Sequence, residues 1–483
     1  MTTTSTSGPD SAQSVPNTNI DENGVDGMTR AIAHFARTLR LDSVPEHTRA
    51  IARQIIVDSI ACGLGGFDCD AATMARKIAP FPAAGDNGGV VFVHGERTTA
   101  DAAAFINTAM IRFFDFNDSF PTAHPSDTIG ALLAVAAAED VSGERLLTAV
   151  IVAYEVFNRL TESARMRYLG WDQGSGVAIA VAAGLGSMLE LDEQQVIHAV
   201  SLAAVAVVPL RATRAGRLSL WKGAATAESA REATYLTQLA RMGMTGPTAA
   251  FEGRHGHFEL ITGEFTMQPF PPTGEFLLEK VRLKFWPLEY NIQIAVWAAL
   301  ELRERVPIDQ VESIRIGTYW SAWHETGSEA AKWAPETRET ADHSMPYIFA
   351  RVLLDGTIDI HDFESARYTD PIALDLMRRI SVYEDAEIDA MYPATVAVKI
   401  IAKTVDGDTV EISQKNPRGH DLNRMTFEET SDKFRRLAIA SIGADAAEEA
   451  LERWWEIDSQ ASIADSIQLL CNRPVGASRV VNT

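Results

Sequence analysis

Residues 142–160 read SGERLLTAVIVAYEVFNRL, a segment that begins like a helix and then becomes apolar on nearly every side. Ser142 and Glu144 are typical of a helix N-cap and first turn, and the apolar run starts at Leu146. A helix that is apolar all round is buried inside a larger helical assembly rather than lying on its surface. The segment therefore predicts a mainly α protein with an extensive core of packed helices.

The same character extends in both directions from this segment. Between Met28 and about Gly263, apolar residues recur every three or four positions in one segment after another, as in MTRAIAHFARTLRL, TADAAAFINTAMIRFF and DTIGALLAVAAAEDV. We therefore expect a large all-helical domain over residues 28–271. Residues 1–27 are polar and low in complexity, with no Lys or Arg and no apolar run, which predicts a disordered tail rather than a targeting peptide.

A different pattern follows residue 271. Residues alternate between apolar and polar in three strand-like segments: VESIRIGTYW (311–320), RISVYED (379–385) and ATVAVKIIAKTVDGDTVEISQK (394–415). The VDGD within the last segment is typical of a hairpin turn. Helical patterns at 291–304 and 343–354 lie among the strands. These features predict an α+β domain over residues 272–415.

Helical periodicity returns with TFEETSDKFRRLAIASIG, where Thr426 is a suitable cap and Glu428 and Glu429 lie in the first turn. Residues 416–483 are therefore expected to rejoin the helical domain. The predicted architecture is a large all-helical domain with an inserted, smaller α+β lid domain. Ligand sites often lie in the cleft between two such domains.

Composition and charge limit the possible functions. The chain has 483 residues and a formal net charge of −22, which argues against nucleic acid as a partner. An anionic substrate would need a locally positive pocket. No apolar run is long enough to span a bilayer. The three cysteines have no paired spacing, as expected for a cytoplasmic protein. His255 and His257 lie close together but without a metal-binding pattern around them, so we expect no metal there.

The stretch FFDFNDSFPTAHPSD at 113–127 interrupts the helical pattern, because its two prolines prevent a continuous helix. It brings Asp115, Asp118, Ser119 and His124 together on an irregular segment. Histidine exchanges protons near neutral pH, and a nearby carboxylate can fix its tautomer. The alternative is an ordinary surface loop whose polar residues cap the next helix, and Asp127 is expected to be such an N-cap.

Two further segments could bind anions. LRATRAGRLSLWKG (210–223) gathers Arg211, Arg214, Arg217 and Lys222 in a chain that is short of positive charge. Arginine forks match carboxylates, so this segment is suited to an acidic substrate, although a solvated basic face is an alternative. In YLGWDQGSG (168–176), Asp172 precedes glycines that open a helix, where backbone amides can hold an anion or simply form a tight turn.

Two segments near the α+β domain supply other candidates. RLKFWPLEY (282–290) contains Lys284 shortly before a proline. ETADHSMPYIFARVLLDG (339–356) places His343 and Tyr347 four residues apart, on one face of a helix if that helix begins by Ser344. A buried, structural histidine–tyrosine pair would account for this spacing equally well.

These motifs, together with GMTGPTAAFEG (243–253), occur in this order in the MmgE/PrpD family, which the chain resembles over about residues 28–440. The family includes 2-methylcitrate dehydratase and cis-aconitate decarboxylase. The resemblance implies a helical domain with a lid domain, a pocket between them and a homodimer. It further implies a small polycarboxylate substrate, no metal or other cofactor, and a place in propionate metabolism.

The resemblance also assigns positions. It places the family's DFND aspartate at Asp115, its hydroxyl residue at Ser119, its histidine at His124, its K-x-x-P lysine at Lys284 and its tyrosine at Tyr347.

Two positions bear on the reaction. Decarboxylases of the family usually have a histidine where this chain has Asp172, whereas dehydratase-like members often have an aspartate and share the L-R-x-x-R pattern of Arg211 and Arg214. A histidine often found shortly after K-x-x-P is replaced here by Glu289 and Asn291.

The expected function is that of a hydro-lyase dehydrating 2-methylcitrate or a related alkylcitrate. Such an elimination needs a base, an acid and positive charge near the developing enolate. We expect His124, oriented by Asp115, to transfer one proton and either Tyr347 or Lys284 to transfer the other. The substrate would be bound by six further residues: Ser119, Asp172, Arg211, Arg214, Lys222 and His343. The alternatives are decarboxylation or isomerisation of an acid such as cis-aconitate, and a non-catalytic carboxylate-binding protein.

Overall fold

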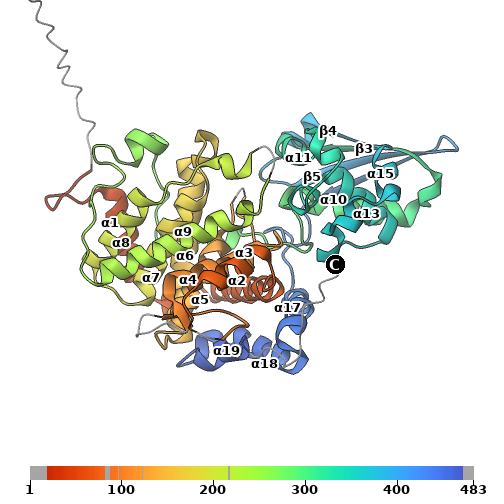
Figure 1. Cartoon of the computed structure of the whole chain (residues 1–483). Helices are drawn as coiled ribbons and strands as arrows, with labels where there is room; N and C mark the ends of the chain where they lie inside the picture. The colour runs from red at the N-terminus through yellow and green to blue at the C-terminus, as the bar shows by residue number, and fades with distance from the viewer. Residues whose placement is uncertain (1–18, 82–87, 96, 122, 216–217, 472–483) are drawn as a thin grey trace, which may run out of the picture.

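The computed structural model describes residues 19–471, apart from 82–87, 96, 122 and 216–217. Two domains lie side by side, one wholly helical apart from a two-stranded hairpin and one containing a four-stranded sheet (Figure 1). The predicted fold class, mainly α with a smaller α+β domain inserted, is confirmed. Among the described residues no single helix is long and apolar enough to cross a membrane, although α2 and α3 together reach that length across a 78° bend.

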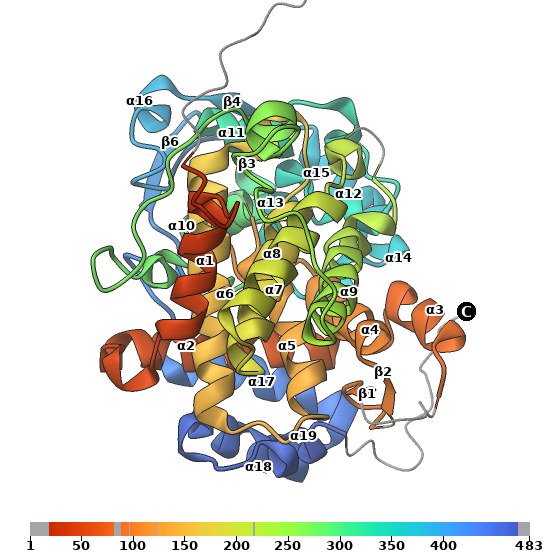
Figure 2. The same ribbon diagram turned by 90° about the vertical axis from the view of Figure 1, so that its left-hand side faces the viewer.

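The helical domain is formed by two separate parts of the chain. Its helices are α1 (Gly27–Thr38), α2 (Glu46–Gly65), α3 (Asp70–Ile78), α4 (Ala100–Arg112), α5 (Ile129–Ala136), α6 (Gly143–Ala164), α7 (Gly174–Met188), α8 (Glu193–Ala206), α9 (Trp221–Arg241), α17 (Phe427–Ile442), α18 (Ala444–Trp455) and α19 (Ala464–Leu469). Figure 2 shows α6, α7, α8 and α9 together, with α18 and α19 beneath them. A short antiparallel hairpin, β1 (Gly88–Val90) and β2 (Arg97–Thr99), packs on α4.

Helix α6 follows the sequence prediction. The Ser142 side chain accepts a hydrogen bond from the Arg145 amide at 3.3 Å and so caps the helix. Its apolar residues are buried all round, as are those of α5 and α7. Thr426 likewise caps α17, where it forms a reciprocal capping box with Glu429.

The second domain consists of a mixed sheet and short helices. Its elements are α10 (Gln293–Arg305), β3 (Val311–Thr318), α11 (Trp320–Thr326), α12 (Arg338–Ala341), α13 (Met345–Asp355), α14 (Ser365–Tyr368), α15 (Pro371–Met377), β4 (Ile380–Glu384), α16 (Ala386–Asp389), β5 (Ala397–Thr404) and β6 (Thr409–Lys415). The strand order is β4-β3-β5-β6, in which β3 and β4 are parallel and the other pairs antiparallel. Helices α10 and α13 pack together and against the sheet. Gly407, with φ +90°, forms the predicted hairpin turn between β5 and β6.

The domain boundaries differ from those predicted. Leu277 and Leu283 belong to the core of the helical domain, and the second core begins at Trp286, so the first boundary lies later than residue 271. The buried carboxylate of Glu155 accepts hydrogen bonds from the amides of residues 277 and 278 and fixes this segment to α6. At the other end, α17 begins only at Phe427, because residues 416–426 form an irregular return segment.

Part of the segment predicted to be a disordered tail belongs to the folded domain. Val25 and Asp26 are buried, and Asp26 caps α1 by accepting a hydrogen bond from the Thr29 amide at 2.7 Å. The prediction of a tail over residues 1–27 is therefore wrong for 19–27. Residues 1–18 and 472–483 lie outside the described residues.

The chain enters and leaves the α+β domain at adjacent points. The Leu283 amide donates a hydrogen bond to the carbonyl of Gly419 at 3.0 Å. Gly419 has φ +97°, and a Cβ there would approach the Leu283 carbonyl oxygen to 2.1 Å. A glycine is therefore required for the two crossings to lie together.

Candidate active site

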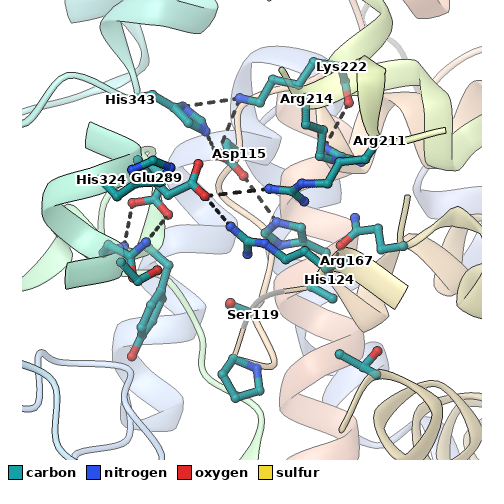
Figure 3. Close-up of a pocket in the computed structure, with 18 of the residues that line it drawn as sticks. Asp115, Ser119, His124, Arg167, Arg211, Arg214, Lys222, Glu289, His324 and His343 are labelled. Atoms are coloured by element: carbon teal, nitrogen blue, oxygen red, sulfur yellow. Dashed lines mark hydrogen bonds and ion pairs between the residues drawn. The ribbon is translucent and has the colours of Figure 1, made fainter. Parts of the chain in front are cut away.

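A cavity of about 350 Å³ lies between the two domains and contains an unusual number of ionisable side chains. The helical domain contributes His124, Arg167 and Arg211 to its wall. Glu289 and His343 reach it from the opposite side, on segments of the α+β domain (Figure 3). This position between domains agrees with the sequence prediction.

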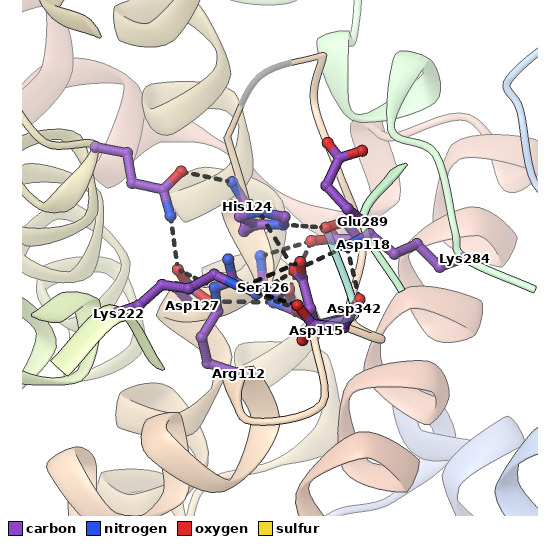
Figure 4. A network of polar contacts seen from close by, with 12 residues as sticks. Arg112, Asp115, Asp118, His124, Ser126, Asp127, Lys222, Lys284, Glu289 and Asp342 are labelled. Atoms are coloured by element: carbon purple, nitrogen blue, oxygen red, sulfur yellow. Dashed lines mark hydrogen bonds and ion pairs between the residues drawn. The ribbon is translucent and has the colours of Figure 1, made fainter. Parts of the chain in front are cut away.

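The loop after α4 is held by its own polar residues. Asn117 donates to Ser126 Oγ at 2.9 Å and to Asp127 Oδ1 at 3.1 Å, and Ser126 donates to Asp118 Oδ1 at 2.5 Å (Figure 4). Asp118 also accepts a hydrogen bond from Tyr154 at 2.8 Å. The prediction that Asp127 is an N-cap is wrong, because this residue lies inside a 3₁₀ turn and its carboxylate binds side chains instead.

His124 is oriented by the backbone. Its Nδ1 lies 2.6 Å from the carbonyl oxygen of Asp118, which can only accept, so Nδ1 carries the proton. In the neutral ring Nε2 then has a free lone pair. Burial, together with the positive charges of Arg112 and Lys284, lowers the pKa of His124 well below its ordinary value. At neutral pH the side chain therefore lines the cavity as a neutral imidazole, with a proton on Nδ1 and none on Nε2.

The carboxylate of Asp115 is the centre of a cluster of cations. Asp115 has the left-handed φ of +50° and accepts hydrogen bonds from Arg112 and, at 2.9 Å, from Lys284 Nζ. Burial opposes its ionisation, but these cations and Lys222 hold the pKa of Asp115 well below its usual range. Its Oδ1 lies 3.9 Å from His124 Nε2, too far to accept a hydrogen bond from the ring, so the structure does not support the expectation that Asp115 orients His124 directly.

Lys284 is completely buried at the same centre. Its ammonium group donates to the Asp115 carbonyl at 2.7 Å as well as to the carboxylate. Burial and the neighbouring Arg112 lower the pKa of Lys284, whereas Asp115 opposes this change. Two of its three donors are therefore used within the protein.

A second cluster joins the two domains above Asp115. His343 Nδ1 donates to Asp342 Oδ1 at 2.5 Å, and His343 Nε2 lies 3.5 Å from Asp115 Oδ2. Burial and the charge of Lys222 lower the pKa of His343, and Asp342 opposes that change. Lys222 Nζ lies 3.3 Å from His343 Nδ1 and 3.7 Å from Asp115 Oδ2. All of these except Asp342 line the cavity.

Of the predicted anion-binding arginines, Arg217 lies outside the described residues, and Arg211 and Arg214 have different partners. Arg214 binds both oxygens of Asp172, at 2.6 and 3.3 Å. Asp172 is buried, is not among the cavity-lining residues, and accepts a hydrogen bond from the Gly174 amide at the start of α7. It therefore positions Arg214 rather than facing the cavity. Arg211 lies 3.7 Å from Glu325 of α11, which Arg167 also contacts at 2.5 Å.

Glu289 differs from the cavity-lining Asp115 and Glu325 because its pKa is raised, whereas theirs are lowered. Its two carboxylate oxygens accept hydrogen bonds from the Asn291 amide at 2.7 Å and from Asn291 Nδ2 at 2.8 Å. Burial raises the pKa of Glu289 to about 7, and the charges of Asp115 and Glu325 add to this effect. The sequence marked this position only as one where a histidine is often found.

Tyr347 does not reach the cavity. Its hydroxyl donates a hydrogen bond to the backbone carbonyl of Asp362 inside the α+β core, and it is not among the cavity-lining residues. His343 precedes α13, whose N-cap is Ser344, so the two side chains do not share a helix face. The expected catalytic role of Tyr347 is therefore not supported, whereas the alternative of a structural tyrosine is.

The remaining predicted residues take varied positions. Ser119 lines the cavity, and its backbone pairs with that of Arg282. His257 is buried and bonded to the Ala204 carbonyl, whereas His255 is exposed beside Glu259. Sequence reasoning missed several cavity residues that carry charge: Arg112, Arg167, Glu325 and Lys332. Of these, only Arg112 had a local signal, its spacing of three residues from Asp115.

The two parts of the chain that line this cavity match the two domains of a known class of proteins. Residues 30–269 match the MmgE/PrpD N-terminal domain and residues 286–457 match the MmgE/PrpD C-terminal domain. The chain belongs to the MmgE/PrpD family.

Among its relatives, 2-methylcitrate dehydratase of Cupriavidus necator is 28% identical over 77% of this chain and 82% of its own length. 2-Methylcitrate dehydratase of Escherichia coli strain K12 is 28% identical over 80% and 84%. Cis-aconitate decarboxylase-like protein oryM of Aspergillus oryzae is 23% identical over 92% and 97%.

Proposed function

We propose that this chain is a hydro-lyase that removes water from 2-methylcitrate or a related alkylcitrate to give the cis-aconitate-type alkene. The relatives named as 2-methylcitrate dehydratases support the reaction class. The observation that carries the proposal is His124, whose Nδ1–H is bound to the Asp118 carbonyl and whose Nε2 is left as an acceptor in a cation-lined cavity.

In this proposal His124 Nε2 removes the proton from the carbon next to a substrate carboxylate. The charge that then develops on that carboxylate needs cations close by, and Lys222 and Lys284, which both contact Asp115, line the same cavity as His124. Asp115 does not act on the ring directly. It holds the ammonium groups of both lysines in place and keeps the centre from accumulating excess positive charge.

Substrate carboxylates would be held by Arg211 and Arg167, which line the same cavity. Both guanidinium groups now contact Glu325, so a substrate carboxylate would take the place of this side chain. Arg214 would contribute its charge from the position that Asp172 fixes.

The test is turnover of 2-methylcitrate, followed by the ultraviolet absorbance of the new conjugated double bond. We expect His124→Ala to lower kcat by about 10²–10⁴-fold, the usual contribution of a general base. The matched control is His361→Ala, because the side chain of this histidine is 77% exposed and is not among the residues that line the cavity. Full turnover by His124→Ala would refute the assignment. Gas release from cis-aconitate without dehydration would instead favour decarboxylation, as in the name of the Aspergillus relative.

The proposal includes a cytoplasmic homodimer acting in propionate metabolism. Support for dimerisation comes from large apolar side chains exposed along α9 and just beyond it, namely Trp221, Tyr235 and Met242. Light scattering should give twice the chain mass, and Tyr235→Glu should shift the protein toward the monomer. A monomeric wild-type protein would exclude this part of the proposal.

A further inference from the structure

The cavity contains a carboxyl group where a polycarboxylate is expected to bind, and this conflict calls for an explanation. Glu289 lines the wall at a point facing the same cavity as His124 (Figure 3). An ionised glutamate would repel an anionic substrate in a site of low dielectric constant. A protonated glutamate would not, and it would in addition be a hydrogen-bond donor.

Hydrogen bonds to neighbouring residues hold the Glu289 side chain in one orientation. Asn291 donates to both carboxyl oxygens, and Asn291 Oδ1 accepts a hydrogen bond from Tyr319 at 2.6 Å. Tyr319 is buried and stacks on Tyr392, with ring centroids 4.4 Å apart. The Glu289 amide donates to the Asp342 carbonyl at 3.1 Å, which ties this residue to the segment that carries His343. These contacts preorganise the Glu289 carboxyl group in the cavity wall.

The charged groups that act on Glu289 include Lys284, Asp115 and Glu325, and the phenols of Tyr319 and Tyr392 also interact with it. His324 of α11 lies beside Glu289 in the cavity wall (Figure 3). Burial and the two carboxylates favour the protonated form at neutral pH, and Lys284 opposes them. A bound polycarboxylate would add negative charge and favour protonation further. The two groups that the sequence suggested as the second proton-transfer residue are less suitable. Lys284 is hydrogen-bonded to Asp115, and Tyr347 does not line the cavity.

We propose that Glu289 is the general acid of the reaction, which donates its proton to the departing hydroxyl group. This inference rests on the proposed dehydration. His124 Nε2 takes the proton from carbon, the C–H electron pair forms the double bond, and the C–O pair leaves with oxygen. That oxygen receives the Glu289 proton and departs as water. His124 and Glu289 then return to their starting states by releasing and taking up one proton each.

The test compares wild type, Glu289→Gln, Glu289→Asp and a control, Glu411→Gln, whose side chain is 59% exposed on β6. We expect Glu289→Gln to lower kcat by about 100-fold or more with little change in KM, and Glu289→Asp to recover at least part of the loss. Wild-type kcat should fall as pH rises beyond the titration of Glu289, whereas this alkaline limb should be absent from Glu289→Gln. A kcat within threefold of wild type, or an unchanged alkaline limb, would overturn the inference.

A second measurement does not depend on turnover. The infrared difference between wild type and Glu289→Gln should contain the band of a protonated carboxyl group at pH 6, and this band should titrate near pH 7. The buried Asp118 and Asp127, whose pKa values are also raised, are present in both proteins and cancel in the difference. Identical carboxyl bands in the two proteins would overturn the inference even if the substrate were another acid. Conversely, wild type that shows this band but leaves 2-methylcitrate unchanged would refute the proposed function alone.

Discussion

Lys433 of α17 provides a demanding test of what holds the loop that carries Asp115 and His124. Its ammonium group donates to Asp58 Oδ1 and to the Phe116 carbonyl, both at 2.7 Å, and to the Lys284 carbonyl at 3.2 Å. The side chains of Lys433 and Asp58 are 2% and 0% exposed. One buried cation thus connects α2, the loop next to Asp115, and the segment that carries Lys284.

We expect Lys433→Met to lower the free energy of unfolding by about 3–5 kcal/mol, because it leaves a buried carboxylate and two carbonyls without their partner. Adding Asp58→Asn should recover about half of that loss, since the uncompensated charge is then removed. Lys399→Met is the control: its partner is Glu411 and both side chains are partly exposed, so the change should stay below about 1 kcal/mol. Equilibrium urea unfolding followed by circular dichroism measures all four proteins.

The pH dependence sharpens this prediction. Burial raises the pKa of Asp58, and Lys433 opposes the rise, so Lys433→Met should raise that pKa further. When the pKa of a carboxyl group is higher in the folded than in the unfolded protein, the free energy of unfolding falls as pH rises between the two pKa values. The fall is at most about 1.4 kcal/mol per pH unit. The destabilisation should therefore be smaller at pH 5 than at pH 7. A loss below about 1 kcal/mol at pH 7, or one independent of pH, would refute the reasoning.

The remaining predictions concern residues near the cavity. Tyr347→Phe should lower the free energy of unfolding by about 1–3 kcal/mol, because the buried Asp362 carbonyl loses its donor, and should leave kcat within twofold of wild type; a large loss of kcat would restore a catalytic role. Glu325→Gln should lower KM about fivefold, since it weakens an internal competitor for Arg167 and Arg211 by about 1 kcal/mol, and a raised KM would contradict this view.

Local chemistry accounts for the parts of the fold that the sequence predicted. Ser142, Thr426 and the turn at Gly407 act on backbone groups within a few residues, so their effects can be read directly from neighbouring letters. The first domain boundary could not be read in this way. It depends on Glu155, which binds amides 122 and 123 residues further along the chain.

The site shows the same division. Asp115, His124 and Lys284 were found from residue types in unusual loops, and the structure brings them together. The group that orients His124 is a backbone carbonyl, which has no signature in the sequence. Tyr347 was chosen from its spacing to His343 and from the family motif, but the helix begins between the two residues and separates the directions of their side chains. Lys433 and Asp58 meet across 375 residues, so only the folded chain reveals their pairing.

The adjacent crossings at Leu283 and Gly419 have a consequence for how such a protein could diversify. Since the chain enters and leaves the α+β domain at one place, a whole domain from a relative could be grafted there through two neighbouring junctions. Such a chimera would keep the cavity wall of the helical domain, which carries His124. It would replace the wall of the α+β domain, which carries Glu289, Glu325 and His343. Recombination at this seam would exchange half of the substrate's surroundings in one event and leave the histidine's own scaffold undisturbed.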